Sequence, residues 1–317
     1  MDVFQEVLAA ETRIREYVRQ TPLRIASRLS QTIRGKVYLK LENIQHTGSF
    51  KVRGALNKLL SCTSSERQRG IITASTGNHG LAVAHALSVL GMRGAIYLPE
   101  TASEHKIAKL RQFDVDIVFH GQDGVEAERE ARRVSVEQGQ VYVSPYNDPA
   151  VIGGQGTLAV ELLRHTTGID MVLLSVGGGG LIAGVAGYLK EMLPAVQVIG
   201  CSPQASPIMH ESIRAGTIVD RPVQCTLSDG TAGGIEKGAI TYELCRRLVD
   251  DWLLVEEPAI AHAMKQIHED ERMIIEGSAG VTVASLLKHG ARFEGKTVAL
   301  IICGGNVAMN QFAEIIR

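Results

Sequence analysis

Lys51 is the residue of this chain whose type and position are best suited to covalent chemistry. It belongs to the stretch SFKVRGA at residues 49–55, between a segment, 37–42, whose apolar alternation predicts a strand, and a segment, 55–60, that predicts a helix. A cation gains nothing from the macrodipole near a helix N-terminus. An amine held there has a lowered pKa and is a better nucleophile, although a solvated surface lysine also fits this stretch alone.

A run of four glycines, residues 177–180, follows an apolar segment, 171–176, that predicts a central strand, and precedes a predicted helix, 181–193. Without side chains, the backbone N–H groups of such a run can approach a phosphate closely, and the helix dipole favours its negative charge. Glycines also serve simply as turns, but four between a strand and a helix are more than a turn requires. The run therefore indicates phosphate binding.

A dinucleotide-binding fold is the first alternative for such a glycine run. That fold needs an acidic residue at the end of the following strand, where it holds the ribose hydroxyls. Here the predicted strand, 196–200, ends in Cys201, Ser202 and Pro203. Because the acid is missing, a phosphate without a ribose fits better.

A phosphate loop together with a reactive lysine points to pyridoxal phosphate, whose aldehyde condenses with a lysine amine. Four motifs stand in order along the chain: SFKVRGA at 49–55, STGNHG at 75–80, the four glycines at 177–180 and CGGN at 303–306. With these motifs the chain resembles the fold type II pyridoxal-phosphate enzymes of the threonine/serine dehydratase and serine racemase group. The resemblance covers nearly the whole length.

The resemblance implies a role for each matching residue. Lys51 forms the Schiff base with the cofactor and also acts as the base for the α-proton, Asn78 bonds the cofactor's 3′-oxygen, and Cys303 faces its pyridine nitrogen. The other cofactor-binding residues are Phe50, Gly177, Gly178, Gly179, Gly180 and Leu181. The substrate carboxylate is taken by a loop of Ser75, Thr76, Gly77 and His79, with Thr76 also catalytic. Capping of a helix is the simpler alternative for Asn78 and His79.

Cys303 bears on the choice of reaction. An aspartate facing the ring nitrogen would keep it protonated, whereas a neutral thiol leaves it largely unprotonated and the ring a weaker electron sink. A weaker sink favours prompt loss of a β-leaving group over transamination. The alternatives are that the thiol is a small buried hydrophobe, or that the phosphate and lysine make it irrelevant.

Two positions depart from the patterns of the group. Racemases carry serine where this chain has Thr76, whose methyl crowds the site. Cation-dependent members carry carboxylates where this chain has Ser202 and Ile208, so we expect no metal there. The residues after 306 also leave no room for the carboxy-terminal regulatory domain of feedback-inhibited threonine dehydratases.

The resulting prediction is an ammonia-lyase that converts an L-β-hydroxy amino acid, such as threonine, serine or a 3-substituted serine, into a 2-oxo acid and ammonia. An amino-acid racemase with dehydratase side activity is one alternative. A phosphate- or pyridoxal-binding protein without catalytic activity is another.

The elements that must position these residues alternate between strand and helix. Strands and helices in turn from 70 to 144 predict a small parallel sheet, inserted into a larger discontinuous domain. We expect an α/β fold with two open twisted parallel-sheet domains: 1–60 and 148–317 bind the cofactor, and 61–147 close over the substrate. Helices are expected over 3–18, 81–90 and 155–166, and a looser region over 202–237.

The composition limits the partners and the cellular compartment that we expect for this protein. With a formal net charge of −1 and 21% charged residues in 317, the chain has no electrostatic footprint for nucleic acid or anionic membrane. Its five cysteines are scattered and odd in number, which favours a reducing compartment. The first 19 residues lack the apolar core of a signal peptide, and no apolar run is long enough to span a bilayer. We therefore expect a cytoplasmic protein, and the resemblance implies a homodimer.

Overall fold

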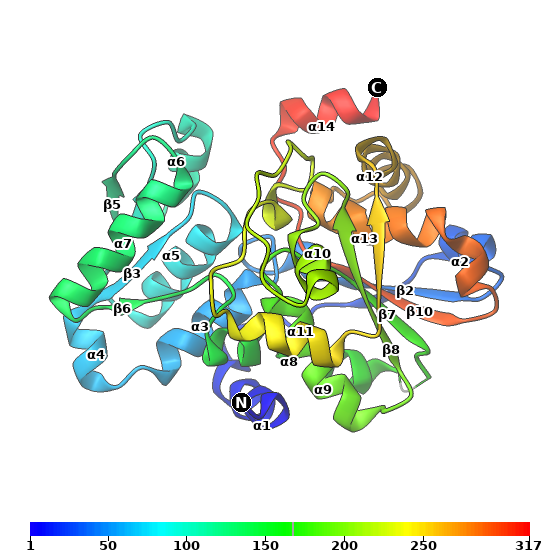
Figure 1. The fold of residues 1–317 in the computed structure, drawn as a ribbon, viewed down its shortest axis with the longest axis horizontal. Coiled ribbons are helices and arrows are strands. Elements are labelled where there is room, and N and C mark those ends of the chain that lie inside the picture. The colour runs from blue at the N-terminus through cyan, green and yellow to red at the C-terminus, as the bar shows by residue number, and fades with distance from the viewer. Residues whose placement is uncertain (167) are drawn as a thin grey trace.

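The computed structural model describes residues 1–166 and 168–317, and it contains two β-sheets that lie side by side with helices packed around each (Figure 1). The first and last helices both belong to the part built around the larger sheet, whereas the smaller sheet comes from a continuous middle segment of the chain. The predicted insertion of one α/β unit into another matches this arrangement. The boundaries at 61 and 147 stay a prediction.

The larger sheet has six strands in the order β1-β2-β10-β7-β8-β9. Its strands are β1 (Leu23–Ile25), β2 (Lys36–Leu41), β7 (Met171–Ser175), β8 (Gln197–Pro203), β9 (Asp251–Val255) and β10 (Thr297–Ile302). All neighbours pair in parallel except β1, which pairs antiparallel with β2 at the edge. Strands β7 and β10 are central and buried almost throughout, as their apolar sequences predict.

The smaller sheet has four parallel strands in the order β5-β4-β3-β6. These are β3 (Ile71–Ala74), β4 (Gly94–Leu98), β5 (Asp116–Phe119) and β6 (Val141–Tyr142). Because the chain returns through a helix between successive strands, the carboxyl ends of all four lie on one edge of the sheet. That edge faces the loops of the larger sheet and carries the turn after β3.

The helices are α1 (Val3–Ile14), α2 (Ser27–Thr32), α3 (Lys51–Ser61), α4 (Ser64–Arg69), α5 (Asn78–Leu90), α6 (Glu104–Leu110), α7 (Gly124–Gln138), α8 (Pro149–His165), α9 (Gly180–Met192), α10 (Ile208–Ala215), α11 (Ile240–Leu248), α12 (Glu257–Glu271), α13 (Gly277–Lys288) and α14 (Met309–Ile316). The short 3₁₀ helices are η1 (Glu42–Ile44), η2 (Asp229–Thr231) and η3 (Gly290–Phe293). None of the helices in the described part of the chain is long and apolar enough to cross a membrane.

Helix α8 begins at Pro149, six residues before the predicted start, so the prediction of a helix over 155–166 was too short. Gly153 and Gly154, which lie just before the predicted start, are helical and stand where neighbouring backbone approaches closely. A Cβ on Gly154 would come within 2.6 Å of the Arg53 carbonyl oxygen on α3, and one on Gly153 within 2.9 Å of the Glu6 carbonyl oxygen on α1. These glycines therefore allow helices to pack tightly rather than ending one.

Two other predicted helices also differ from the structure. Helix α1 ends at Ile14 instead of residue 18, because the chain turns there and the backbone of Arg19 bonds the side chain of Gln45. Helix α5 begins at Asn78 rather than residue 81, so Gly80 lies within the helix. A Cβ on Gly80 would meet the Ser75 carbonyl oxygen at 2.1 Å, so this position needs glycine. The region predicted to be loose, 202–237, contains helix α10, which buries Ile208 and Met209.

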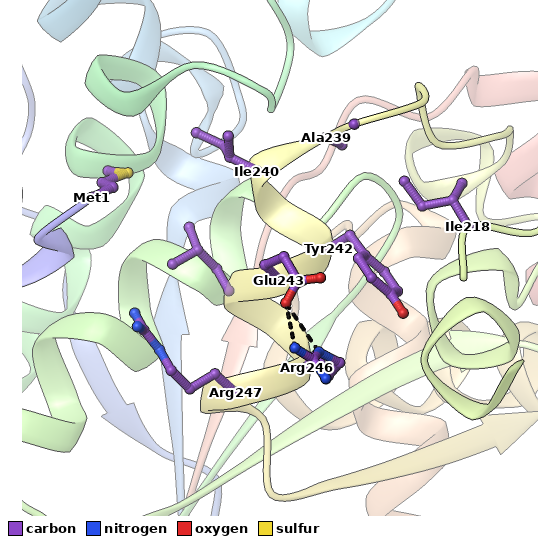
Figure 2. Close-up of a pocket in the computed structure, with 10 residues that line it drawn as sticks. Met1, Ile218, Ala239, Ile240, Tyr242, Glu243, Arg246 and Arg247 are labelled. Atoms are coloured by element: carbon purple, nitrogen blue, oxygen red, sulfur yellow. Dashed lines mark hydrogen bonds and ion pairs between the residues drawn. The ribbon is translucent and has the colours of Figure 1, made fainter. Parts of the chain in front are cut away.

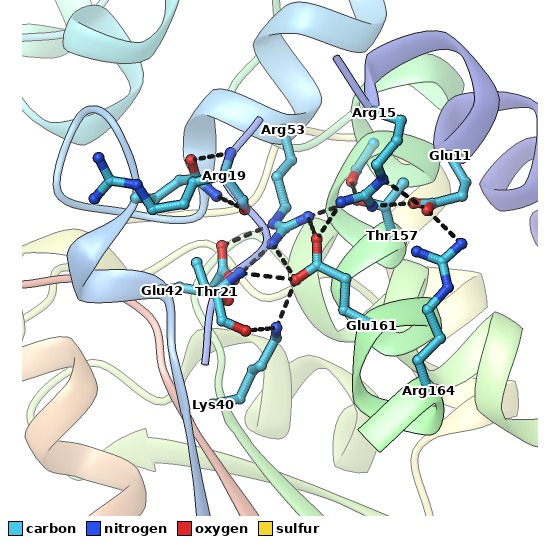
Figure 3. A network of polar contacts seen from close by, with 12 residues as sticks. Glu11, Arg15, Arg19, Thr21, Lys40, Glu42, Arg53, Thr157, Glu161 and Arg164 are labelled. Carbon is cyan, nitrogen blue, oxygen red and sulfur yellow. Dashed lines mark hydrogen bonds and ion pairs between the residues drawn. The ribbon is translucent and has the colours of Figure 1, made fainter. Parts of the chain in front are cut away.

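A group of charged side chains, which we call the buried ion cluster, lies where α3, β2 and α8 meet (Figure 3). It consists of Arg53, Glu42, Glu161 and Lys40, whose side chains are 0% exposed. Arg53 Nε donates to Glu42 at 2.8 Å and its Nη1 to Glu161 at 2.8 Å, and Lys40 Nζ donates to Glu161 at 2.5 Å. The cluster joins the first turn of α3 to the larger sheet.

Candidate active site

The glycine run and Cys303 meet at one edge of the larger sheet. Strands β7 and β10 are parallel neighbours, so their carboxyl ends lie side by side. The chain passes from β7 into the glycines and from β10 into Cys303. The Ser175 hydroxyl at the end of β7 donates to Cys303 Sγ at 3.4 Å. Two segments more than a hundred residues apart in sequence thus form one edge of a site.

Lys51 is the first residue of α3, which begins four residues before the predicted helix of 55–60; the predicted place of Lys51 near a helix N-terminus is confirmed. The preceding turn is held against the CGGN segment, because Phe50 N–H donates to the Cys303 carbonyl at 3.0 Å and Ser49 forms an antiparallel bridge with Gly304. The amine of Lys51 donates to the carbonyl of Pro145 at 2.7 Å. Although the residue keeps some exposure to solvent, loss of hydration around its amine lowers the pKa to about 8.

A cleft of about 580 Å³ lies in front of this edge and is lined by residues of both α/β units. Every residue assigned to the site from the sequence lines it: Phe50, Lys51, Ser75, Thr76, Gly77, Asn78, His79, Gly177, Gly178, Gly179, Gly180, Leu181 and Cys303. The structure thus brings together all of the candidate residues, and their individual roles stay predictions.

The glycine run forms a tight turn between β7 and α9. Gly179 is the N-cap of α9 and has φ +86°, a left-handed conformation that favours glycine. A Cβ on Gly178 would lie 2.4 Å from the ring of Tyr146, and one on Gly177 would lie 2.8 Å from Thr231 Cα. The loop therefore needs glycine for its own packing as well as for backbone access to a phosphate.

The STGNHG segment forms the turn after β3 and the first turn of α5. The ring of His79 is buried, and its Nε2 lies 2.9 Å from the Val143 carbonyl, so that nitrogen carries the proton. Burial, together with the charge of Lys51, lowers the pKa of His79 to about 3. A neutral imidazole bound to the backbone leaves the N–H groups at the helix start as the donors for a carboxylate.

Cys303 is buried at the end of β10, and burial raises the pKa of its thiol far above its ordinary value. The nearby carboxylate of Glu276 acts in the same direction. The thiol is therefore neutral, which is the state that the sequence argument assumed for a group beside the pyridine nitrogen.

Glu276, Asn306 and Tyr146 are among the lining residues of the cleft to which the sequence gave no role. Glu276 is the N-cap of α13 and accepts two hydrogen bonds from Asn78 Nδ2, at 2.9 and 3.0 Å. Asn306 belongs to the CGGN motif but had no role, and Tyr146 packs against the glycine run. The signal for Glu276 was an acid directly before a helix of small residues, which is weak because acids commonly occupy that position.

Ser202 and Ile208 stand at the two positions where the resemblance implies carboxylates in cation-dependent members of the family. The Ser202 hydroxyl is buried and donates to the Val176 carbonyl at 3.2 Å, and Ile208 is buried in the core of the larger unit. In the described part of the chain, no group of three or more His, Cys, Asp or Glu side chains is placed to hold a metal ion.

A second hollow, of about 760 Å³, lies on the surface over α11 (Figure 2). Its lining includes Met1, Ile218 and Tyr242, and two of its three charged side chains, Glu243 and Arg246, pair with each other at 2.6 Å. None of the candidate residues lies in its lining, within the residues that the structure describes. The smaller cleft is the candidate site because the reactive amine and the glycine loop meet there.

Comparison with known proteins agrees with this geometry. A model of the pyridoxal-phosphate dependent enzymes matches residues 14–304, so the chain belongs to that family. The L-threonine ammonia-lyase of Thermotoga maritima is 38% identical, over 100% of this chain and 79% of that protein. The catabolic L-threonine dehydratase of Escherichia coli K12 is 33% identical, over 98% of this chain and 94% of that protein.

Two solved structures share the fold over more than nine tenths of their length. Threonine deaminase isoform 2 of Solanum lycopersicum superimposes with a TM-score of 0.94 at 32% identity, covering 99% of this chain and 92% of that chain. Maize serine racemase superimposes with a TM-score of 0.93 at 30% identity, covering 98% of this chain and 95% of that chain. The fold is therefore that of these pyridoxal-phosphate enzymes, as the sequence predicts, with two α/β units.

The residues present fit pyridoxal phosphate, the cofactor of this family. A phosphate needs backbone N–H groups free of side chains, and a Cβ on Gly177 or Gly178 would meet neighbouring atoms at 2.8 Å or less. An aldehyde needs an amine with a lowered pKa, and Lys51 has one. Both groups line the same cleft.

Proposed function

We propose that this chain catalyses β-elimination from an L-β-hydroxy amino acid, with release of a 2-oxo acid and ammonia, and that L-threonine and L-serine are its first candidate substrates. The observation that carries the proposal is the amine of Lys51, with a pKa near 8, in the same cleft as the glycine run and the neutral thiol of Cys303. The relatives named as L-threonine ammonia-lyase and L-threonine dehydratase support the reaction and the substrate class.

The residues of the chain have distinct tasks in this reaction. Gly177, Gly178, Gly179, Gly180 and Leu181 would hold the cofactor's phosphate, Phe50 would help to bind the cofactor, and Asn78 would donate to its 3′-oxygen; all of these residues line the cleft. The N–H groups at the start of α5, around Ser75 to His79, hold the substrate carboxylate. When bound, the cofactor supplies an electron sink for the bond to the α-proton.

Lys51 removes the α-proton of the substrate, and the β-hydroxyl leaves with a proton as water. The resulting enamine becomes an imine, and a water molecule hydrolyses it to the 2-oxo acid and ammonia. Water is thus lost once and consumed once. A neutral Cys303 facing the pyridine nitrogen would leave that nitrogen unprotonated, which would favour elimination over transamination.

Amino-acid racemisation is the second candidate function, since maize serine racemase shares the fold. Racemisation requires a proton donor on the face opposite Lys51, and Thr76 carries a hydroxyl in the cleft. Its methyl group must then occupy space beside the substrate. We therefore place racemisation below elimination.

We also propose a homodimer in the cytoplasm, in which the segment 61–147 closes over the substrate. The free state of all five cysteines supports a reducing compartment. Sedimentation of the purified protein tests the dimer, and a monomer at micromolar concentration would contradict it.

The decisive experiment replaces Lys51 with alanine. We expect turnover of L-threonine and L-serine to fall by at least about a thousandfold, because the same amine binds the cofactor and moves the proton. Lys36→Ala, at an exposed position on β2, is the matched control and should keep full activity. Borohydride reduction followed by mass spectrometry should place the reduced cofactor on Lys51. A few per cent of residual activity in Lys51→Ala would overturn the assignment.

A further inference from the structure

Glu276 is a buried carboxylate that lines the cleft, and the proposed reaction gives it no task. Its side chain accepts hydrogen bonds from Asn78 Nδ2 at 2.9 and 3.0 Å and from the backbone N–H of Asn306 at 3.0 Å. In the described part of the chain it takes part in no ion pair. A buried carboxylate held by neutral donors is costly and therefore needs an explanation.

The hydrogen bonds around Glu276 determine which way the amide of Asn78 faces. The Asn306 amide donates to the Thr47 carbonyl at 2.7 Å, so its Nδ2 is the donor. The same Nδ2 donates to Asn78 Oδ1 at 2.7 Å. Asn78 must then present its NH₂ group to Glu276. Each amide is thus oriented by its neighbour, and the chain of donors ends on the carboxylate.

The position of Glu276 is also fixed by the backbone around it. A Cβ on Gly304 would lie 2.6 to 2.7 Å from the Glu276 carboxylate, so the carboxylate packs directly against the CGGN segment. A Cβ on Gly230 would lie 3.5 Å from Glu276 Oε1. The carboxylate has little freedom to move, and its charge stays close to Lys51 and Cys303.

We propose that Glu276 is a positioning residue of this site, which holds the NH₂ group of Asn78 toward the cofactor's 3′-oxygen and places a negative charge beside the amine of Lys51. The inference rests on the proposed function, since it concerns the same cofactor. The 3′-oxygen accepts hydrogen bonds, as the Glu276 carboxylate does. If the Asn78 amide were flipped, its Oδ1 would face both acceptors and could donate to neither. A negative charge near Lys51 stabilises the protonated form of the amine.

The charged and titratable groups that face Glu276 are Lys51 from α3, Cys303 from β10 and Asp229 from η2. Burial raises the pKa of Glu276 to about 7, and Asp229 acts in the same direction, whereas Asn78, Asn306 and Lys51 lower it. The folded apoprotein therefore binds a proton between pH 4.5 and 7 that the unfolded chain has lost. Its stability should fall as pH rises through this window, which reverses the usual behaviour of carboxylates.

The test compares Glu276→Gln with Glu276→Asp, which keeps the charge, and with Glu271→Gln. Glu271 is another buried glutamate whose pKa burial raises, but it lies at the end of α12 and pairs with Arg24. The first measurement is the pH midpoint at which a small amine-specific reagent modifies Lys51 in the apoprotein. We expect Glu276→Gln to lower it by about one unit, a tenfold change in proton affinity, and the other two variants to leave it within a few tenths.

A second measurement follows the absorbance of the bound cofactor against pH, and its midpoint should move in the same direction. A third follows the melting temperature of the apoprotein, whose fall between pH 4.5 and 7 should be shallower in Glu276→Gln. Unchanged midpoints in Glu276→Gln, or an equal shift in Glu271→Gln, would overturn the inference. If wild type binds no cofactor at Lys51, the proposed function itself fails, which the absorbance of wild type reports separately.

If Glu276→Gln does not fold, Asn306→Ser still tests the orienting half of the inference. It removes the donor to Asn78 Oδ1 and leaves the charge of Glu276 in place. We expect cofactor affinity to fall about tenfold, the usual cost of a lost hydrogen bond to a bound ligand, with the Lys51 midpoint unchanged. Unchanged affinity would show that Asn78 needs no such support.

Discussion

Thr76 is the residue at which the two candidate reactions of this site separate. It lies in the turn between β3 and α5 and lines the cleft with Lys51. Elimination needs one base, which Lys51 supplies, whereas racemisation also needs a donor on the opposite face. A threonine hydroxyl can donate, but its β-methyl restricts χ1 and occupies space beside the substrate.

We expect Thr76→Ser to raise racemisation relative to elimination by about tenfold, because serine keeps the hydroxyl and removes the methyl. Thr76→Ala is the matched control: it frees the same space without a proton donor and should not raise racemisation. Chiral chromatography of the recovered amino acid, beside an assay of 2-oxo acid, measures both rates. Equal rates of D-isomer and 2-oxo acid in the wild type would contradict the assignment.

Ser202 and Ile208 determine the expected response to chelators. A hydroxyl bonded to a carbonyl and a buried alkyl group are poor ligands for a hard cation. We expect the rate of 2-oxo acid release to stay within about a factor of two after exhaustive chelation. A loss of activity that magnesium restores would mean that other groups bind the cation.

At the scale of single elements, the turn from β7 into α9 has two requirements at once. Its glycines let Tyr146 and Thr231 pack against the loop, and they leave the backbone N–H groups accessible to a phosphate. A loss of cofactor after a glycine substitution could therefore arise from altered packing alone. Comparing two substitutions at one position separates the causes.

Gly179→Ala and Gly179→Asp share the strain of a side chain at φ +86° and the approach of Cβ to 2.9 Å from Cys245 Sγ. Only the aspartate adds a negative charge facing the phosphate. We expect the dissociation constant of the cofactor to be about a hundredfold larger for Gly179→Asp than for Gly179→Ala, roughly 3 kcal/mol of repulsion. Equal dissociation constants in a cofactor titration would place the phosphate elsewhere.

At the scale of the whole molecule, the buried ion cluster connects the reactive lysine to the fold. Arg53 lies two residues after Lys51 on α3. Its guanidinium donates hydrogen bonds to both Glu42 and Glu161. Although burial alone would raise the pKa of Glu161, Arg53 and Lys40 hold it at about 2. Glu161 is therefore ionised at neutral pH, so removal of Arg53 leaves a buried charge without its partner.

We expect Arg53→Met to lower the free energy of unfolding by about 3 to 5 kcal/mol, because two buried carboxylates lose their main partner. Arg133→Met is the matched control: Arg133 pairs with Glu130 and Glu137 on the surface of α7, so its loss should lower the free energy of unfolding far less. Urea denaturation of the apoproteins measures both. Similar costs would mean that the cluster contributes no more than surface pairs.

The sequence by itself determined the chemistry of the site and the class of fold. Lys51 and the glycine run could be recognised because each stands in a local strand–turn–helix pattern whose residue types carry the chemistry, whereas the role of Cys303 was implied by the resemblance of its CGGN motif to the family. The alternation of strands and helices likewise predicted two parallel sheets, since apolar periodicity is a local property of the chain.

Only the tertiary structure determined which distant residues contact those site residues. Glu276 reaches the site through a hydrogen bond to Asn78, 198 positions away, and no local pattern signals such a pairing. Gly153 and Gly154 lie before the predicted helix start but are helical, and their role in close helix packing depends on which distant backbone approaches them. Burial and packing are properties of the folded chain, so the orientation of Asn78 and the partners of Arg53 followed from the structure alone.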